Sequence, residues 1–599
     1  MQKKWMLKQT SVDVDALAQD ANIHPVLAHV LAVRGYRKAE EIKLFMNSDY
    51  TKLADIFLFK DMEKAISITT SAIQEHKKIT IFGDYDVDGI SSTVILYRTL
   101  QYLNANVSFF IPKRADGYGL NPQVVREIKK NDTDLIIACD NGIAAFNEVS
   151  LAKELGMDII ILDHHEIPVE IYENGETKQV VPTADAIVDP KQSNCNYPYK
   201  HFCAAGICYR FAQGLVLSND ADWSIPNDEL TIFAMLGTVC DLVALNGENR
   251  LIVQNGLRLL PDTHNLGLKT LIQATGIREK DLTTYHIGYI IGPCLNASGR
   301  LQTVEEAILL FLINEPEEAK NIARNLIKLN QQRKDITNIG TITAIAQIEE
   351  NLILENDNNR LLLIYNPQIH ESVAGIIAGK IKEKYNRPTI VVGGEKDHIL
   401  KGSCRSIEGY NIMKGLKRVE DLLATYGGHP LAAGFTVERD YLPLLAERLN
   451  QDPELLQMDF AQILRIDKYL PLSHCDLNLA EEIKKLEPFG IGNPIPYFVD
   501  RNVLIDRITL IGKDESVVRM HCKISGRNNW VELISFNGKD QLFQLLQKDD
   551  VWDQLLQGKA PGIRMDIIYT IKINEFQNRK KIQLCLLDFR LGEKQTCPH

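Results

Sequence analysis

Ile79-Thr80-Ile81-Phe82-Gly83-Asp84-Tyr85-Asp86-Val87-Asp88-Gly89 is the segment of this chain that indicates its fold class most clearly. Its first four residues are mostly β-branched or aromatic and predict a short strand, and a helix is predicted from Ser91 to about Leu103. Between them, two glycines allow a tight turn that carries three aspartates. This order is typical of the α/β class, in which ligands bind outside the carboxyl ends of parallel strands.

The alternation of strand and helix continues along the next hundred residues. Further strands are predicted at 107–112, 135–139, 158–162 and 186–188, and helices from Asn121-Pro122 to about Lys130 and from about Ala145 to Leu155. Near-continuous apolar strands separated by helices imply a parallel sheet that is covered on both faces.

The regions outside this sheet have patterns of their own. Residues 1 to about 65 predict short helices, including an apolar one at 24–35. Residues 317–351 contain no proline and repeat apolar residues with helical spacing, which predicts a connecting helix of about 50 Å. A second α/β block follows, and from about residue 460 several short strands without long helices between them fit an OB-like barrel.

The predicted fold is therefore a parallel-sheet α/β catalytic domain, a long helix, a second α/β domain and a C-terminal OB-like β-barrel. The predicted boundaries are 1–65 for the N-terminal helices, 66–310 for the catalytic domain, 311–352 for the connecting helix, 353–458 for the second domain, 459–591 for the barrel and 592–599 for a tail.

Composition narrows the class of protein. The chain has 599 residues and a net charge of -11, which argues against a protein that only coats nucleic acid but suits an enzyme that gathers carboxylates around metal ions. The eleven cysteines form no CxxC pair, no signal peptide is evident, and no apolar run is long enough to span a membrane. We therefore expect a cytoplasmic protein without a membrane partner.

Acidic and histidine side chains follow three of the predicted strands. The aspartates of the opening stretch follow the first, Asp140 follows the third, and Asp163-His164-His165 follows the fourth. The carboxyl ends of parallel strands meet at one sheet edge, so we expect these groups to lie together. Carboxylates suit hard divalent cations, and added imidazole favours Mn²⁺. The pattern predicts a two-metal site that hydrolyses phosphodiester bonds.

These ordered motifs resemble those of a known family. Gly83–Gly89, Asp140-Asn141-Gly142 and Asp163-His164-His165 are similar to motifs of the DHH phosphoesterase superfamily, and Gly427-Gly428-His429-Pro430-Leu431-Ala432-Ala433-Gly434-Phe435 to the motif of its associated second domain. Two further motifs, residues 292–301 and residues 488–494, narrow the resemblance to the RecJ-type single-strand-specific exonucleases. The resemblance covers nearly the whole chain.

The resemblance implies a two-domain catalytic core with an OB-fold and with Mn²⁺ or Mg²⁺. It implies processive 5′ to 3′ degradation of single-stranded DNA in DNA repair and recombination, by a monomer whose expected protein partners are a single-strand-binding protein and a repair helicase. Two alternatives are a related phosphodiesterase that acts on short oligonucleotides and a non-catalytic replication scaffold of the same fold. The complete set of acids and histidines speaks against the scaffold.

The resemblance also implies roles for individual residues. The implied metal ligands are Asp84, Asp86, Asp88, Asp140, His164 and Asp241, with Asp140 as the bridging group. The implied catalytic residues are Asp140 and His165, the latter near the scissile phosphate. The implied substrate-binding residues are Arg114, Asn296, Arg300, Ser403, Arg405 and His429, of which Arg114, Ser403 and Arg405 would clamp the terminal 5′ phosphate.

Two positions depart from the family pattern. Smaller superfamily members have a histidine four residues before the middle aspartate, where this chain has Phe82, and Asp84 is expected to take over that ligand position. Asp189 stands where this type commonly has Asn, and we expect it to support the site. In the barrel, core packing is the expectation for all four candidate base-stacking aromatics: Trp530, Phe536, Tyr569 and Phe576.

Overall fold

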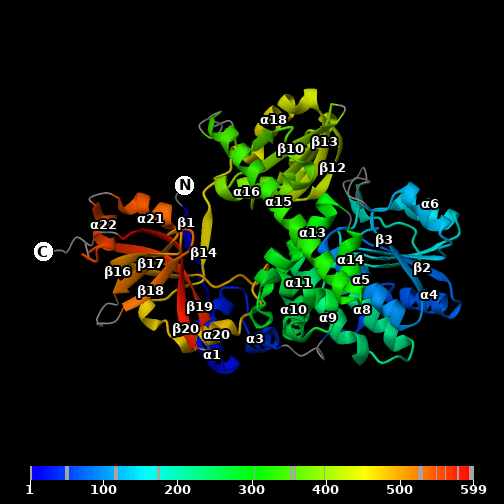
Figure 1. Cartoon of the computed structure of the whole chain (residues 1–599), viewed down its shortest axis with the longest axis horizontal. Helices are drawn as coiled ribbons and strands as arrows, with labels where there is room; N and C mark the ends of the chain where they lie inside the picture. The colour runs from blue at the N-terminus through cyan, green and yellow to red at the C-terminus, as the bar shows by residue number, and fades with distance from the viewer. Residues whose placement is uncertain are drawn as a thin grey trace. The chain divides into compact units, whose positions relative to one another are not determined.

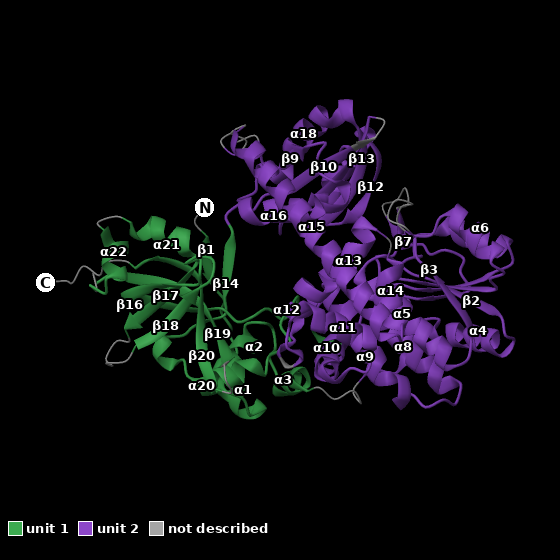
Figure 2. Ribbon diagram, in the orientation of Figure 1, with its two compact units in different colours: residues 1–49, 245–247, 462–599 green, residues 50–244, 248–461 purple. Residues whose placement is uncertain are grey.

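The computed structural model describes residues 3–47, 53–112, 119–171, 176–302, 304–350, 354, 359–396, 398–523, 530–547, 550–559, 562–576 and 579–592. The chain divides into two compact units, which Figure 2 distinguishes by colour. Unit 1 contains residues 1–49, 245–247 and 462–599, and unit 2 contains residues 50–244 and 248–461. The N-terminal helices, predicted as a segment of their own, thus share unit 1 with the barrel.

Unit 2 contains the predicted parallel sheet. Its strands lie in the order β3-β2-β4-β5-β8, and each neighbouring pair is parallel. Figure 1 labels β2 and β3 of this sheet. The strands are β2 (Lys78–Phe82), β3 (Asn106–Phe110), β4 (Leu135–Cys139), β5 (Asp158–Leu162) and β8 (Ala186–Val188). All five predicted strands are confirmed, and the strands that precede the acidic motifs, β2, β4 and β5, are neighbours in the sheet.

Helices cover both faces of this sheet, as predicted. On one face, α6 (Pro122–Lys130) and α7 (Phe146–Glu154) pack on alternate residues of β4 and β5, such as Ile136 and Ile161. On the other face, α5 (Val87–Tyr102) contacts β2, β3 and β4, and α8 (Ala204–Ser218) contacts β5. Helix α4 (Met62–Gln74) packs against α8 and β8.

The beginning of α5 differs from the prediction. The helix begins at Val87, four residues before the predicted Ser91. The reason is a cap, because the Asp86 carboxylate accepts hydrogen bonds from the N–H groups of Asp88 (2.9 Å) and Gly89 (3.1 Å). Asp88 therefore lies in the first turn of a helix, where its direction is fixed.

The rest of unit 2 up to residue 312 is mostly helical. The helix α9 (Ser224–Cys240) packs on α5 and α8. The remaining elements up to residue 312 are η2 (Ile56–Leu58), the strands β6 (Val169–Ile171) and β7 (Thr177–Gln179), α10 (Gly247–Leu259), η4 (Leu260–Asp262), α11 (Leu266–Thr275), η5 (Glu279–Asp281), α12 (Thr284–His286), the π-helix η6 (Ile287–Ile291), α13 (Gly292–Leu301) and α14 (Glu305–Leu312).

The predicted connecting helix is α15 (Pro316–Glu350). Its glycine, Gly340, is a point of close approach, since a Cβ there would lie 2.5 Å from Cδ1 of Ile377. Ile377 belongs to α16 (Glu371–Tyr385) of the second α/β block, so α15 packs directly on that block.

The second α/β block of unit 2 has a five-stranded sheet in the order β12-β13-β11-β10-β9. Only the β9–β10 pair is parallel among these neighbours. The strands are β9 (Leu362–Tyr365), β10 (Thr389–Lys396), β11 (Ile399–Arg405), β12 (Leu423–His429) and β13 (Ala432–Glu438). The helices besides α16 are α17 (Ile412–Lys417), η7 (Glu420–Leu422), η8 (Arg439–Tyr441), α18 (Leu442–Asn450) and α19 (Pro453–Leu456).

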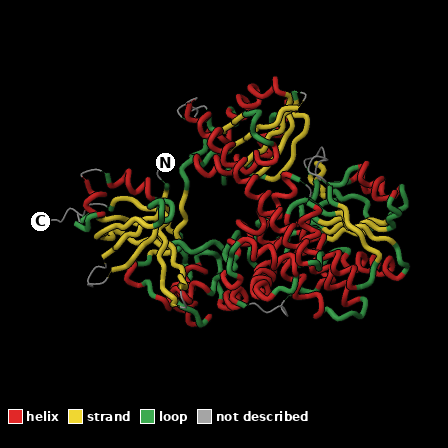
Figure 3. Tube along the Cα trace, viewed as in Figure 1, coloured by secondary structure: helices red, strands yellow, loops and turns green. Residues whose placement is uncertain are grey.

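Unit 1 contains the predicted OB-like barrel, whose strands are yellow in Figure 3. Five strands close it in the order β16-β17-β18-β20-β19, because β19 also pairs with β16. The elements are β14 (Ile463–Ile466), β15 (Lys468–Tyr469), η9 (Leu472–His474), α20 (Leu477–Lys484), β16 (Phe498–Ile511), β17 (Val517–Lys523), β18 (Trp530–Ser535), α21 (Lys539–Leu546), α22 (Val551–Leu556), β19 (Arg564–Phe576) and β20 (Arg579–Leu591).

The N-terminal residues belong to the same core as the barrel. Strand β1 (Lys4–Leu7) pairs with β14, and the helices α1 (Val14–Ala21), α2 (Pro25–Ala32) and α3 (Ala39–Met46) follow. Leu27 and Ile42 of these helices share one hydrophobic cluster with Phe498 and Met520 of the barrel. This shared cluster explains why unit 1 contains both ends of the chain.

The barrel aromatics divide into buried and exposed side chains. Tyr569 is fully buried, as expected, but Trp530 and Phe536 are 45% and 51% exposed, so the expectation of core packing is wrong for these two. The side chain of Phe576 lies outside the described residues. The predicted domain boundaries inside unit 2 stay predictions. Among the described helices, none is long and apolar enough to cross a membrane.

Candidate metal centre

The turn after β2 closes tightly onto the start of α5. A Cβ at Gly89 would lie 2.6 Å from the backbone oxygen of Asp84, so only glycine fits there. Together with the Asp86 cap, this close approach holds the carboxylates of Asp84, Asp86 and Asp88 in one tight loop. Phe82, which replaces the histidine of smaller relatives, is fully buried and stacks on Phe110 at 6.0 Å.

The Asp88 carboxylate lies where three helices meet. It accepts hydrogen bonds from the N–H groups of Ala204 (2.7 Å) and Ala205 (2.9 Å), the first residues of α8, whose positive end favours an anion. Gly237 of α9 borders it, since a Cβ there would lie 2.5 Å from Asp88 Oδ1. Burial, followed by repulsion from Asp86, raises the pKa of Asp88 to about 7.

His164 is the centre of the cluster. Its Nε2 lies 3.2 Å from Asp140 Oδ1 and 3.7 Å from Asp88 Oδ2, and its Nδ1 lies 3.7 Å from Asp241 Oδ2. Burial, followed by the charge of the neighbouring His165, lowers the pKa of His164 to about 3. The ring is therefore neutral at physiological pH, which is the form that binds metals.

Asp140 follows β4 in a left-handed backbone conformation, with φ of 64°. Aspartate and asparagine adopt this conformation more readily than most residues with a Cβ. The side chain is almost fully buried. Burial, followed by repulsion from Asp88, Asp86 and Asp84, raises the pKa of Asp140 well above its ordinary value.

His165 forms a pair with Asp163. Its Nδ1 lies 2.7 Å from Asp163 Oδ1, and the same carboxylate accepts the N–H groups of His164 (2.8 Å) and Ile143 (3.0 Å). Burial alone would lower the pKa of His165, but Asp163 outweighs it and raises that pKa to about 9. Burial likewise opposes the charge of Asp163, but His165 lowers its pKa below the ordinary value. His165 is therefore a cation at neutral pH.

The side chains form three groups, each of which offers three ligand atoms within 4.8 Å of one another. The groups are Asp84, Asp86 and Asp140; Asp88, His164 and Asp241; and Asp140, His164 and His165. Because Asp163 keeps His165 protonated, the first two groups suit a cation better than the third. Asp140 lies 3.2 Å from His164 and thus between the first two groups.

The charge state of these groups fits divalent cations. Burial is the largest cause that raises the pKa of Asp88, Asp140 and Asp241, and repulsion among the carboxylates adds to it. So many buried carboxylates ionise together only when a positive charge compensates them. An oxygen-rich set with one neutral imidazole is the donor set that Mg²⁺ and Mn²⁺ accept.

The second α/β block brings one predicted residue directly to this cluster. His429, at the end of β12, stacks near His165 with ring centroids 6.1 Å apart and planes 16° apart. Ser403 and Arg405 lie on β11 against α16, and Gly375 makes room for them: a Cβ there would lie 2.7 Å from Ser403 Oγ and 2.8 Å from Arg405 Nη2. Burial lowers the pKa of Arg405, and within the described residues no carboxylate pairs with it.

Two predicted substrate residues hold other parts of the protein together. Asn296 of α13 accepts a hydrogen bond from the N–H of Val87 (3.1 Å), so its carbonyl oxygen ties α13 to the acidic turn. Arg300 donates to the backbone oxygen of Ser372 and thereby joins α13 to α16. Arg114 lies outside the described residues. The roles of the predicted site residues stay predictions.

One charged residue near the cluster was missed by the sequence analysis. Lys191 pairs with Glu166 at 2.9 Å. Burial and His165 lower the pKa of His164 and His429, and the charge of Lys191 adds to this lowering. The same charge opposes the rise in the pKa of Asp241 that burial causes. The sequence does indicate this position, because Lys191 follows the predicted strand at 186–188 and therefore lies at the same edge of the sheet. Asp189 accepts the N–H of Lys191 (2.8 Å), and burial, followed by repulsion from Asp163, raises its pKa to about 8.

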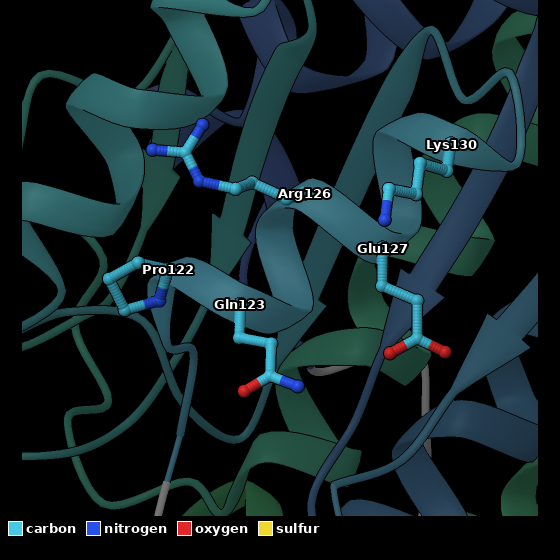
Figure 4. A pocket seen from close by; sticks show the side chains of 5 residues that line it. All are labelled: Pro122, Gln123, Arg126, Glu127 and Lys130. Atoms are coloured by element: carbon cyan, nitrogen blue, oxygen red, sulfur yellow. The ribbon is translucent and has the colours of Figure 1, made fainter.

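A separate surface pocket of about 560 Å³ lies on α6. Figure 4 shows its described lining, which comes from that helix alone: Pro122, Gln123, Arg126, Glu127 and Lys130. None of these residues belongs to a ligand group, so the chemistry belongs to the strand-end cluster instead.

Three family models match successive segments of the chain. The DHH family, N-terminal domain, matches residues 78–238, the DHHA1 domain matches residues 358–452, and the RecJ OB domain matches residues 466–588. The first match contains most of the acidic cluster. The fold and the cluster together define a phosphoesterase of the DHH class.

Relatives narrow this class. The chain is 35% identical to the single-stranded-DNA-specific exonuclease RecJ of Bacillus subtilis over 99% of this chain and 71% of that protein. It is 30% identical to RecJ of Escherichia coli over 98% of this chain and 99% of that protein. The chain belongs to the RecJ family of single-stranded-DNA-specific exonucleases.

Solved structures agree with this fold. RecJ of Thermus thermophilus in complex with Mn²⁺ is similar with a TM-score of 0.78 at 24% identity, over 98% of this chain and 80% of that chain. An exonuclease RecJ bound to manganese is similar with a TM-score of 0.56 at 28% identity, over 68% of this chain and 97% of that chain.

Proposed function

We propose that this chain is a metal-dependent exonuclease that hydrolyses phosphodiester bonds of single-stranded DNA in the 5′ to 3′ direction, in DNA repair and recombination. The observation that carries the proposal is the pair of ligand groups that gathers at the ends of β2, β4 and β5 and at the end of α9, with Asp140 between them. The relatives are named for action on single-stranded DNA, and related structures hold Mn²⁺ or Mg²⁺.

Each ligand group has a place in the proposed reaction. Asp84, Asp86 and Asp140 would hold one metal, and Asp88, His164 and Asp241 the other, with Asp140 shared. Bound Mn²⁺ or Mg²⁺ would lower the pKa of a water molecule and neutralise the charge that develops on the phosphate. The neutral ring of His164 leaves a nitrogen lone pair for coordination.

His165 is proposed to act on the phosphate itself. Because Asp163 occupies its Nδ1 and keeps the ring protonated, Nε2 carries a proton that it can donate to a non-bridging phosphate oxygen. His429 stacks beside this ring and narrows the space around it. Asp163 thus positions His165 and sustains its charge.

The proposed recognition of a 5′ phosphate uses Ser403 and Arg405. The half-buried guanidinium of Arg405 has no carboxylate partner within the described residues, and the missing Cβ of Gly375 leaves room for Ser403 Oγ and Arg405 Nη2. A half-buried cation without a carboxylate partner favours an anionic ligand such as phosphate. Action as a monomer with a single-strand-binding protein and a repair helicase is a finer proposal that rests on the family alone.

The test is product analysis with Asp140→Asn. Asparagine tolerates the left-handed backbone at this position better than alanine does, so the fold is expected to persist while the charge is lost. With Mn²⁺ and 5′-phosphorylated single-stranded DNA, the native protein is expected to release a 5′ label as mononucleotide first and a 3′ label last. The variant is expected to lose at least ~100-fold in rate, since a metal ligand of this kind contributes several kcal/mol.

The matched control is Asp132→Asn, since Asp132 also has a positive φ of 56° but is exposed and outside the ligand groups. It is expected to keep full activity. Undiminished hydrolysis by Asp140→Asn would refute the proposed metal centre. Release of the 3′ label first would refute the polarity, and faster hydrolysis of a dinucleotide than of a long strand would favour the oligonucleotide phosphodiesterase.

A further inference from the structure

The helical segment that leads into α13 carries two prominent tyrosines. Tyr285 and Tyr289 are 60% and 67% exposed, the largest values for any aromatic side chain in the part of the chain that the structure describes. Their rings stack on each other, with centroids 5.1 Å apart and planes 25° apart. Two adjacent, stacked and exposed aromatic rings form a flat apolar surface.

The opposite side of the same segment is buried. Ile287 and Ile291 are fully buried, so the tyrosines occupy the solvent side of an otherwise packed helix. Polar residues normally cover such a side, because they cost less free energy in water than aromatic rings do. The pair therefore needs a reason other than packing within the described residues.

The pair is held in place before any ligand arrives. His286 lies between the tyrosines in the chain, and its Nδ1 lies 2.9 Å from Thr283 Oγ1. The imidazole meets Tyr285 edge-on, with centroids 5.6 Å apart and planes at 83°. Tyr289 belongs to the π-helix η6, and short π-helices occur frequently at functional sites. A fixed surface loses little entropy on binding.

This segment is continuous with the metal cluster. The thiol of Cys240 donates to the backbone oxygen of Ile287 (3.9 Å), and a Cβ at Gly292 would lie 2.5 Å from Cys240 Sγ. Cys240 directly precedes Asp241, a member of the second ligand group. Further along, Asn296 of α13 holds the acidic turn through Val87. The tyrosines and the ligand loops therefore share one packed framework.

We propose that Tyr285 and Tyr289 form a stacking platform for bases of the single-stranded DNA whose phosphodiester bonds reach the metal cluster. The proposal rests on the proposed function and adds a contact to it. Aromatic side chains stack on any base, because each base has a π-face, so the contact is independent of sequence. Bases in a duplex already stack on each other, and the platform therefore favours single strands.

The test compares Tyr289→Ala and the double alanine variant with Tyr289→Phe, which keeps a ring. Tyr441→Ala is the matched control, because Tyr441 is another exposed tyrosine of unit 2, at 43%. Binding of a fluorescent single-stranded oligonucleotide by anisotropy without metal and KM with Mn²⁺ are measured. The alanine variants are expected to bind about 5- to 100-fold more weakly, and the phenylalanine and Tyr441 variants like the native protein.

Removal of single bases from the oligonucleotide completes the test. An oligonucleotide with single abasic sites is scanned along its length, and one or two positions are expected to weaken binding to the native protein but not to the double alanine variant. Alanine variants that bind within two-fold of the native protein would overturn the platform, as would an equal loss on intact and abasic strands. Failure of the proposed function is distinguishable, because the native protein would then bind without hydrolysing.

Discussion

Gly237→Ala tests whether close helix packing sets the position of a metal ligand. The added Cβ would lie 2.5 Å from Asp88 Oδ1, about 0.9 Å inside the ordinary contact distance of 3.4 Å. The carboxylate cannot yield without cost, since it is held by the N–H groups of Ala204 and Ala205 at 2.7 and 2.9 Å. A shift of this size would stretch at least one of these bonds beyond the usual limit of ~3.2 Å.

Stability and metal affinity are expected to respond differently. Alanine favours the helix over glycine by ~1 kcal/mol, whereas overpacking costs ~1–3 kcal/mol, so the net loss of stability is at most about 2 kcal/mol. Metal sites tolerate displacements of only ~0.2 Å, and changes to their supporting contacts typically weaken binding by ~10–100-fold. The expected result is therefore Mn²⁺ affinity at least ~10-fold below that of the native protein.

The assay is isothermal titration of metal-stripped protein with Mn²⁺. Gly379→Ala is the matched control, because Gly379 lies inside α16 and a Cβ there would meet nothing within 4 Å. This control is expected to keep native Mn²⁺ affinity and to gain up to ~1 kcal/mol of stability. If Gly237→Ala bound Mn²⁺ as tightly as the native protein does, the argument that Gly237 positions Asp88 would be refuted.

Two further predictions concern protons. Burial raises the pKa of Asp88 from 3.8 to about 7, so the metal-free fold loses stability as pH rises through this range. Because bound Mn²⁺ compensates the ionised carboxylate, the rise in melting temperature on adding Mn²⁺ is expected to be larger at pH 8 than at pH 5. An equal rise at both pH values would contradict this prediction. Asp163→Asn removes the charge that holds the pKa of His165 near 9, so the alkaline limb of the pH–rate profile is expected to shift to lower pH by at least ~1 unit. An alkaline limb at unchanged pH would show that Asp163 does not set the charge of His165.

Local sequence patterns are sufficient to predict the parallel sheet and the loops that carry the ligands. Strand and helix periods are local properties, and β4, β5 and β8 begin and end at their predicted residues. Parallel strands present their carboxyl ends at one edge of a sheet, so the sequence also predicts that Asp140 and His164 lie together. The motifs were also sufficient to indicate the family.

Which atoms face one another depends on how distant segments pack in the folded chain. The cap at Asp86 moved the start of α5 and turned Asp88 toward α8, because a cap depends on side-chain geometry rather than on periodicity. Asn296 was predicted to bind substrate, yet its oxygen holds the acidic turn.

The charges and exposed surfaces likewise depend on packing between distant segments. The charge of Asp163 keeps His165 protonated, and Lys191 lies near the cluster because the folded sheet brings its strand ends to one edge. The exposure of Tyr285, Tyr289 and Trp530 could not be predicted either, since an aromatic residue on a helix or strand has the same local pattern whether or not another element covers it. Burial and electrostatic coupling are properties of the assembled chain, and they determine which of the predicted groups can act.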